Sequence, residues 1–349
     1  MNTQTLIIGG GLTGLSLAYR LQQAGHDFQL VEARSRFGGR IKSLDVDGRA
    51  FDLGPSWIWQ GQHRVAQMLQ ELNLHVFEQW SAGTQLYEQA SGEVLQNAGF
   101  MSMAGSMRIG GGTGALTNAL VAALDPSRLQ SNAAVERINH GPNATLANGQ
   151  VIKAQQIVLA VPPRIAAQVT FDPALPREAN ASLREIPTWM GAHAKFVAVY
   201  PTPFWREDGL SGEASSKRGP LAEIHDASPM DGSLGALFGF VGLPAHVRAQ
   251  AGPALEQAAL AQLANLFGPQ ASTPIAMQLE DWSRAPFTAA PADVTPPSEH
   301  PSYAMPEALR DVWNDQLIFA VTELISDNGG LIEGALAASE AAAAQVLTR

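Results

Sequence analysis

The sequence predicts an α/β protein that begins with a Rossmann-type nucleotide-binding unit. Residues 6–8 form a short apolar run of the buried-strand type, and residues 9–14 continue it with the glycine pattern G-x-G-x-x-G. Apolar residues then recur at helical spacing as far as Gly25, which suits the end of a helix. A second apolar run over 28–32 ends in an acidic residue, Glu32. This order of strand, glycine turn, helix and strand is the setting in which the glycine pattern indicates a dinucleotide site.

Each glycine of the pattern has a physical role of its own within this unit. Gly9 permits the tight turn, and Gly11 lets the backbone approach a pyrophosphate without a Cβ in the way. Gly14 lets the helix lie close on the strand, and the helix N-terminus offers unpaired N–H groups to phosphates. Glu32 stands where a carboxylate accepts the ribose hydroxyls, which favours an adenosine without a 2′-phosphate. The pattern alone does not separate NAD from FAD.

Composition and charge fit a soluble globular protein and exclude several classes of site. The chain has 349 residues, enough for one large core or two domains, and a mean hydropathy of −0.02. A net charge of −10 argues against nucleic acid or an anionic membrane as partner. Without cysteine there is no disulfide, thiolate metal site or cysteine nucleophile, and no His or carboxylate group shows the spacing of metal ligands. No leader or membrane-spanning run is visible, so we expect a cytoplasmic protein.

The remaining segments alternate between strand and helix patterns. The glycine-rich stretch 108–114 opens a helix over 115–124, but no long strand precedes it and no acid follows at the proper distance. We therefore interpret it as a tight loop and not as a second nucleotide site. Elsewhere the patterns predict hairpins over 45–53 and 144–152, helices over 65–74 and 255–267, and strands over 135–138, 156–161, 234–243, 277–282 and 317–323. Six prolines between 285 and 306 forbid regular structure there.

Two apolar stretches contain residues that allow more than one interpretation. Trp57 and Trp59 share one face if extended, and from the residues alone they are a core aromatic pair or the wall of a site. Lys195 lies in the apolar strand 190–200, where an ammonium is costly unless it is paired or deprotonated. The alternative is an edge strand from which Lys195 reaches water. His193 shares the face of Lys195, and we interpret it as a hydrogen-bonded strand residue in preference to a site residue.

Three further segments carry a resemblance to a known family. Residues 34–40 read R-S-R-F-G-G-R, residues 203–205 read P-F-W after the lysine strand, and residues 319–335 contain F-A-V-T-E followed by G-G-L-I-E-G-A. In these elements the sequence resembles the flavin-containing amine oxidase family. The resemblance implies a Rossmann-type FAD-binding domain interleaved with an α+β substrate domain. The implied limits are 1–60, 108–165 and 300–349 for the first domain, and 61–107 and 166–299 for the second.

The resemblance also implies which residues contact the cofactor. The segment 54–57 is expected to pass beside the flavin, with Trp57 lining the substrate cavity, and Val135 to offer backbone groups to the adenine. Glu323 is expected near the ribityl–phosphate region, and the helix from Leu331 to aim its N-terminus at the pyrimidine edge of the flavin. The implied contacts are Gly9, Gly11, Leu12, Thr13, Gly14, Glu32, Ala33, Arg34, Gly39, Arg40, Gly54, Pro55, Ser56, Trp57, Val135, Trp282, Glu323, Leu331 and Ile332.

Lys195 is the one catalytic side chain that the resemblance implies, because the family's lysine holds a water against flavin N5 and assists reoxidation by O2. The FAD is expected to be non-covalent, since Pro291 stands at the place of the family's cysteine link and the chain contains no cysteine. Three positions depart from the family. Ala292 and Leu331 replace the tyrosines of an aromatic cage, and Val321 replaces a glycine where backbone nears the cofactor.

The function that these expectations favour is an FAD-dependent oxidoreductase. Hydride would pass from a carbon bearing an amine to flavin N5, and O2 or another acceptor would reoxidise the flavin. Three alternatives stay open: a renalase-like oxidase of reduced nicotinamides, a nicotinamide-dependent dehydrogenase, and a flavin-binding protein without amine oxidase activity. The expected partners are a small-molecule substrate and an electron acceptor, and the sequence indicates neither their identity nor the oligomeric state.

Overall fold

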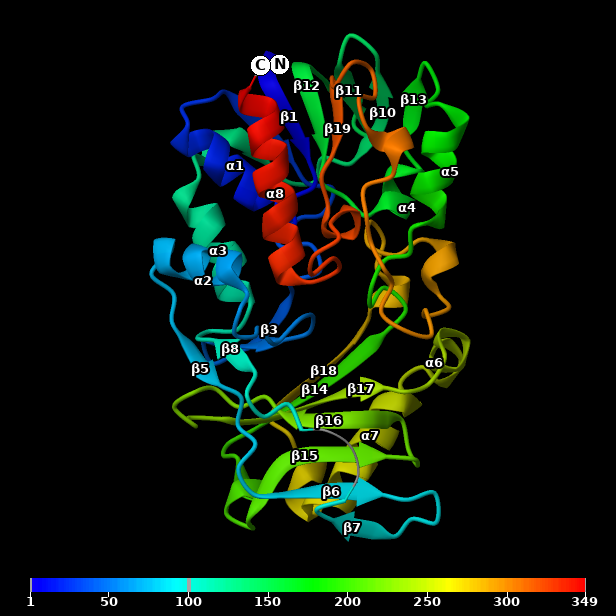
Figure 1. The fold of residues 1–349 in the computed structure, drawn as a ribbon. Helices are drawn as coiled ribbons and strands as arrows, with labels where there is room; N and C mark the ends of the chain where they lie inside the picture. Colours follow the sequence, from blue (N-terminus) through cyan, green and yellow to red (C-terminus); the bar gives the residue numbers. More distant parts are fainter. Residues whose placement is uncertain (1, 99–101, 349) are drawn as a thin grey trace.

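The computed structural model describes residues 2–98 and 102–348, and it contains two large sheets (Figure 1). The first sheet has eight strands in the order β13-β10-β11-β12-β1-β2-β9, with β19 paired to β12. Its central strands are parallel and apolar, as expected for strands covered on both faces. The strands are β1 (Asn2–Ile8), β2 (Phe28–Val31), β9 (Leu129–Gln130), β10 (Val135–Asn139), β11 (Asn143–Leu146), β12 (Val151–Leu159), β13 (Thr170–Asp172) and β19 (Leu317–Phe319).

Helices cover both faces of the first sheet, and the side chains of β1 alternate between the two cores. Ile7 packs into the core that contains α1, α2, α3 and α8, whereas Leu6 and Ile8 pack into the core that contains α4 and α5. Figure 1 shows α1 and α8 side by side on one face, in agreement with their many mutual contacts. The helices are α1 (Leu12–Gln23), α2 (His63–Glu71), α3 (Gly114–Ala123), α4 (Pro163–Ala166), α5 (Arg177–Glu185) and α8 (Ile332–Leu347).

The strand β12 combines two segments that the sequence predicts as separate. Its first residues pair antiparallel with β11, as expected for the hairpin over 144–152. Its last residues pair parallel with β19, and almost its whole length pairs parallel with β1. The polar stretch 153–156 lies in mid-strand, which is why the hydrophobic pattern breaks although the strand does not.

The second sheet has seven strands in the order β18-β14-β17-β16-β15-β6-β7. The helix α7 (Ala254–Phe267) packs on one face, preceded by α6 (Ala245–Ala251), and the hairpin of β3 (Ser43–Val46) and β4 (Arg49–Asp52) packs on the other. Because β14 lies between β17 and β18, it is an interior strand, and the edge-strand alternative for Lys195 is wrong. The strands are β6 (Thr84–Glu88), β7 (Val94–Gln96), β14 (Ala194–Tyr200), β15 (Leu210–Ser216), β16 (Leu221–Asp226), β17 (Gly235–Val241) and β18 (Ala276–Asp281).

Short elements connect the two sheets. A two-stranded ribbon of β5 (Val76–Glu78) and β8 (Met107–Ile109) lies between them (Figure 1). Between β18 and β19 the chain, all of it described, contains single 3-10 turns but no α-helix or strand, as the prolines predict. Within the described residues no helix is both long enough and apolar enough to cross a membrane.

Three elements pack differently from the expected domain limits. The strand β13 pairs with β10 of the first sheet, and α5 packs into the core on that sheet's second face. The helix α2 contacts α8 and shares its core. All three fall in ranges that the resemblance assigned to the substrate domain. A local hydrophobic pattern shows that an element is half-buried, but it does not show which sheet covers it.

Candidate cofactor and active site

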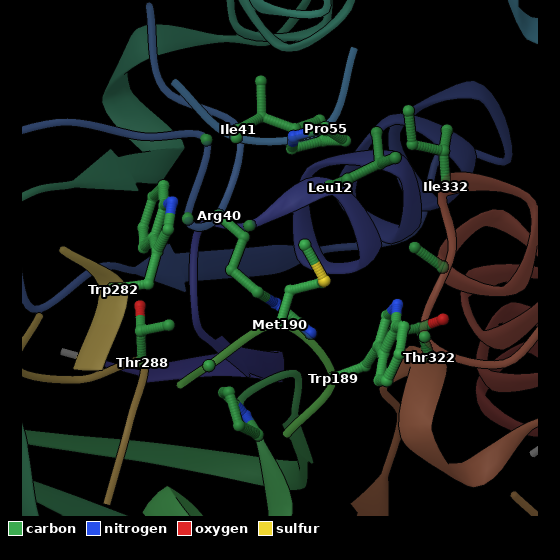
Figure 2. A pocket seen from close by; sticks show the side chains of 18 of the residues that line it. Leu12, Arg40, Ile41, Pro55, Trp189, Met190, Trp282, Thr288, Thr322 and Ile332 are labelled. Carbon is green, nitrogen blue, oxygen red and sulfur yellow. The ribbon is translucent and has the colours of Figure 1, made fainter. Parts of the chain in front are cut away.

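A cavity of about 350 Å³ lies between the two sheets. Its wall combines the turns that follow β1 and β12, the N-terminal ends of α1 and α8, and residues of β14 and β17. Figure 2 shows Leu12 of α1 and Ile332 of α8 on one side of the cavity and Trp282 on another, with Arg40 between them. The position is the one at which α/β folds bind nucleotides, outside the carboxyl ends of parallel strands.

The glycine turn leaves a backbone cradle of the kind that a pyrophosphate requires. A Cβ on Gly14 would lie 1.9 Å from the Gly9 carbonyl oxygen, so only glycine permits this close approach of α1. A Cβ on Gly11 would have nothing nearer than Gly39 Cα at 3.9 Å, and it would occupy the cavity itself. No side chain caps α1 at Gly11 and its first turn contains no acid, which leaves the N–H groups of that turn to a bound anion. The cradle therefore fits the pyrophosphate of FAD.

Glu32 lies in the cavity wall in a fixed orientation. Its Oε2 accepts a hydrogen bond from the Gly10 N–H at 2.8 Å, and its Oε1 accepts one from the Arg34 N–H at 2.9 Å. A carboxylate oxygen accepts more than one hydrogen bond, so both oxygens keep capacity for ribose hydroxyls. The ribose contact stays a prediction.

Arg40 brings a fixed positive charge to the cavity, and Glu323 holds it there. Both terminal nitrogens of Arg40 donate to the Glu323 carboxylate, which is fully buried. Burial by itself would lower the pKa of Arg40, but the charge and hydrogen bonds of Glu323 raise it above its usual value. Glu323 is not among the lining residues of the cavity, and its carboxylate provides the counter-charge to Arg40. The contact with the cofactor that the resemblance implies for Glu323 stays a prediction. Three other expected contacts also lie outside the lining residues: Gly14, Ala33 and Val135.

Lys195 reaches the cavity from the second sheet and is buried, with 2% of its surface exposed. Its Nζ donates to Ser56 Oγ at 2.6 Å and to the Gly54 carbonyl at 3.0 Å. It also lies 3.8 Å from the centre of the Phe238 ring. Burial lowers the pKa of Lys195 to about 7, opposed by the charge of Asp52. The lysine is therefore paired, buried and close to its neutral form, as the sequence suggested for a lysine in an apolar strand.

Aromatic side chains form much of the remaining wall. Trp57 and Trp59 both line the cavity, and Trp59 is 39% exposed, so the interpretation of a core aromatic pair is wrong. Trp57 Nε1 donates to Gln79 Oε1 at 2.9 Å, and Trp282 Nε1 donates to the Leu53 carbonyl at 3.0 Å. These bonds fix the planes of two indole rings at the cavity.

Some lining residues carry no signal in the sequence. Trp189 and Met190 enter the cavity from the loop between α5 and β14, and Met190 has the left-handed φ of +61° (Figure 2). Phe287 and Thr288 line the cavity from the proline-rich segment. Pro291 and Ala292, which the resemblance places at the flavin, are not among the lining residues.

His193 also lies at the cavity. It precedes β14, and its Nδ1 is buried without a hydrogen-bond partner among the residues that the structure describes. Burial, followed by the charge of Arg248, lowers the pKa of His193. His193 precedes the strand and borders the cavity, which favours the alternative of a site residue over that of a hydrogen-bonded strand residue. In the described ranges, 2–98 and 102–348, no three His, Cys, Asp or Glu side chains are grouped as metal ligands.

The first sheet provides a Rossmann unit with an open pyrophosphate cradle, and the second sheet provides a buried lysine and an aromatic wall. Together these features define a dinucleotide-dependent enzyme. Comparison with known families agrees. A family model described as "Flavin containing amine oxidoreductase" matches residues 83–347, and one described as "NAD(P)-binding Rossmann-like domain" matches residues 7–72. The chain belongs to the family of flavin-containing amine oxidoreductases.

Individual relatives are distant but cover most of the chain. Putrescine oxidase of Kocuria rosea is 22% identical, over 81% of this chain and 84% of its own. Two solved structures share the fold over the full length of both chains: a putrescine oxidase double mutant, with a TM-score of 0.83 and 21% identity, and cyclohexylamine oxidase from Brevibacterium oxydans, with 0.84 and 22%. The protein is an FAD-dependent oxidoreductase of the amine oxidase type. The alternative interpretation, a nicotinamide-dependent dehydrogenase, is therefore excluded.

Proposed function

We propose that the protein oxidises apolar monoamines, with non-covalently bound FAD and with O2 or another small-molecule acceptor. The flavin supplies the redox chemistry when bound, taking a hydride equivalent from the carbon that bears the amine and passing the electrons to the acceptor. The chain orients that carbon, excludes water and manages the proton. The single observation that carries the substrate class is the chemistry of the cavity wall.

The groups that hold FAD in this proposal all line the cavity. Gly11 and the first turn of α1 receive the pyrophosphate, Glu32 receives the ribose hydroxyls, and Arg40 supplies positive charge to the phosphates. The α8 N-terminus, with Leu331 as its first flanking residue, offers its positive dipole end to the flavin's pyrimidine edge. A non-covalent link is supported by the absence of cysteine from the whole sequence.

The substrate side of the wall is aromatic and has no free acid. Among the described lining residues, the only carboxylate is Glu32, which lies at the nucleotide turn and is already hydrogen-bonded. A diamine would bring a second ammonium into an apolar wall without a counter-charge, at a cost of several kcal/mol. An apolar monoamine instead packs its body against rings such as Trp57 and Trp189. Ala292 is not among the lining residues of the cavity, so its replacement of a cage tyrosine is not evidence against amine oxidation.

Anaerobic titration of the yellow holoprotein tests this proposal. We expect cyclohexylamine and benzylamine to bleach the flavin absorption band, and putrescine to leave it largely unchanged at the same concentration. Reduction by putrescine in preference to both monoamines would contradict the proposed substrate class. Reduction by NADH alone would establish the renalase-like alternative in its place.

We also propose a domain division that follows the two sheets. The FAD-binding domain would comprise residues 1–72, 108–186 and 300–349, and the substrate domain the remainder. This division keeps α2, β13 and α5 with the cores into which they pack.

A further inference from the structure

We propose that Ser56 is the group that donates a hydrogen bond and a proton into the cavity, and that Lys195 acts through it. This inference rests on the proposed function, since it concerns the same flavin site and refines the role that the resemblance gives to Lys195. It makes Ser56 a catalytic residue and Lys195 the positioning residue and proton source behind it.

The first step is a count of the donors on Lys195. A lysine ammonium has three N–H donors and no acceptor. Around Nζ the protein provides three acceptors: Ser56 Oγ at 2.6 Å, the Gly54 carbonyl at 3.0 Å and the face of the Phe238 ring at 3.8 Å. Each N–H group of Lys195 therefore has an acceptor inside the protein. For Lys195 to hold a water in the cavity directly, it would have to give up one of these three.

The second step concerns the hydroxyl of Ser56. A hydroxyl has one O–H donor and two acceptor lone pairs, and Ser56 Oγ uses a lone pair to accept from Lys195. Ser56 lines the cavity but is only 5% exposed, so its hydroxyl is shielded from bulk water. While Lys195 is protonated, its Nζ cannot accept, and no other acceptor for the Ser56 O–H is present among the described residues, which leaves that donor to a group inside the cavity.

The third step is the balance of the proton transfer. Ser56 Oγ gives its proton to a basic oxygen of the reduced O2 in the cavity while Lys195 Nζ gives a proton to Ser56 Oγ. One O–H bond and one N–H bond break, and one bond from the acceptor to hydrogen and one new O–H bond on Ser56 form. The acceptor gains one proton, Ser56 is unchanged, and Lys195 becomes a neutral amine.

The charges around Lys195 allow it to give up this proton near neutral pH. Burial and the neighbouring Arg108 lower its pKa to about 7, and Asp52 acts in the opposite direction. Glu280 lies opposite Lys195 on β18, but its carboxylate is bound by Lys42. A group whose pKa lies near the operating pH is the most effective proton donor.

The test compares hydroxyl and non-hydroxyl variants of the holoprotein: Ser56→Ala, Ser56→Thr, Lys195→Met and the double variant. The control is Ser43→Ala, which removes a buried hydroxyl that lies outside the cavity lining. Each protein is reduced anaerobically with dithionite and then mixed with O2, so the result does not depend on an amine substrate. A failure of the proposed amine chemistry therefore remains distinguishable from a failure of the relay.

We expect Ser56→Ala to slow flavin reoxidation by about 10²-fold, as for loss of a general acid. Ser56→Thr keeps a hydroxyl and should recover much of that loss, whereas the control Ser43→Ala should stay near the parent rate. The double variant should match the slower single variant, because the two side chains act as one unit. An unchanged rate in Ser56→Ala together with a slow Lys195→Met would overturn the proposal, since Lys195 would then act directly.

Two measurements keep the test decisive if Ser56→Ala binds FAD poorly. The absorption spectrum of the resting flavin, titrated from about pH 6 to about pH 9, should show an inflection near neutrality that Lys195→Met abolishes and Ser56→Thr retains. In the unmodified protein, the reoxidation rate in H2O–D2O mixtures should curve with deuterium fraction, because two protons move together. A linear dependence would show a single proton in motion and would reject the relay.

Discussion

At the scale of single residues, the pair between Arg40 and Glu323 keeps a cation at the cofactor cavity. Glu323 is fully buried and receives both terminal nitrogens of Arg40, so a neutral side chain there would leave a poorly compensated guanidinium. We expect Glu323→Gln to lower the free energy of unfolding by about 3 kcal/mol and to weaken FAD binding, because breaking one partner of a buried pair strands the other charge.

Glu307→Gln is the matched control for that change. Glu307 also pairs with an arginine, Arg310, but its side chain is 92% exposed. Exposed pairs of this kind contribute little to stability, so we expect no measurable change. Denaturant titration of both variants, followed by FAD titration, measures the two effects. Equal stability of the two variants would mean that the pair between Arg40 and Glu323 has no special energetic role.

The buried state of Lys195 predicts a pH dependence of stability. The pKa of Lys195 is lowered to about 7 in the folded protein, against about 10.4 in an unfolded chain. Between these values the unfolded state binds a proton that the folded state does not, so this group makes stability rise with pH, by up to ~1.4 kcal/mol per pH unit. The Lys195→Met variant has no group that titrates at this position. The stability difference between parent and variant should therefore shift in favour of the parent from about pH 7 to about pH 9 in urea titrations, and a constant difference would contradict the lowered pKa.

At the scale of elements, the helix α1 can be tested through the glycines near its two ends. A Cβ on Gly14 would meet the Gly9 carbonyl oxygen at 1.9 Å, so Gly14→Ala forces backbone to move. We expect a loss of about 3 kcal/mol in unfolding free energy together with loss of FAD binding. Gly25→Asn is the control, because Gly25 has a left-handed φ of +69° with nothing within 4 Å of a Cβ, and asparagine adopts that conformation readily. Thermal unfolding in parallel measures both, and a Gly14→Ala protein as stable as Gly25→Asn would be inconsistent with the close packing of α1.

Elements were predictable from the sequence where their signal lies within their own residues. The helix α1 and the strands β1 and β2 are found where the glycine pattern and apolar periodicity place them. Side chains whose partners are remote were not predictable. Glu333 is a charged residue of the C-terminal helix, yet it is only 3% exposed, and its carboxylate accepts the N–H groups of Arg64 and Val65 at the start of α2. Val65 is 268 residues away in sequence, a separation at which local periodicity carries no information.

The same distinction applies to the site. Its nucleotide side follows from a local motif, and Lys195 stands out because a lysine interrupts an apolar strand. Its substrate side depends on loops: Trp189 and Met190 reach the cavity through a left-handed backbone at Met190, which a non-glycine sequence does not reveal. Resemblance located the proline-rich segment at the cavity, but it selected Pro291 and Ala292, whereas Phe287 and Thr288 are the lining residues.

At the scale of the whole molecule, the cavity exists only when remote parts of the chain are folded together. Its lining comes from residues 9–62, 160–195, 240, 282–288 and 321–335. The proline-rich segment crosses from the second sheet back to the first, and Arg34 ties it down by donating to Thr288 Oγ1 at 2.6 Å and to the Pro286 carbonyl. Since Arg34 also follows Glu32 at the nucleotide turn, we expect the position of this segment and the binding of the adenosine half of FAD to be coupled through one side chain.

This coupling predicts that FAD stabilises the whole protein and shields the segment, and that FMN does so much less. Ligand at 100 times its dissociation constant raises the free energy of unfolding by about 2.7 kcal/mol when only the folded state binds it. FMN lacks the adenosine that would meet Glu32 and Arg34, so it loses the contacts on which closure depends. Arg284 is exposed in the same segment and offers a trypsin site, so its cleavage rate reports closure directly. We expect FAD, but not FMN at equal concentration, to raise the thermal midpoint of the apoprotein and to slow cleavage after Arg284. Equal protection by FMN would mean that the adenosine half does not engage the nucleotide turn, and that closure is driven from the isoalloxazine end alone.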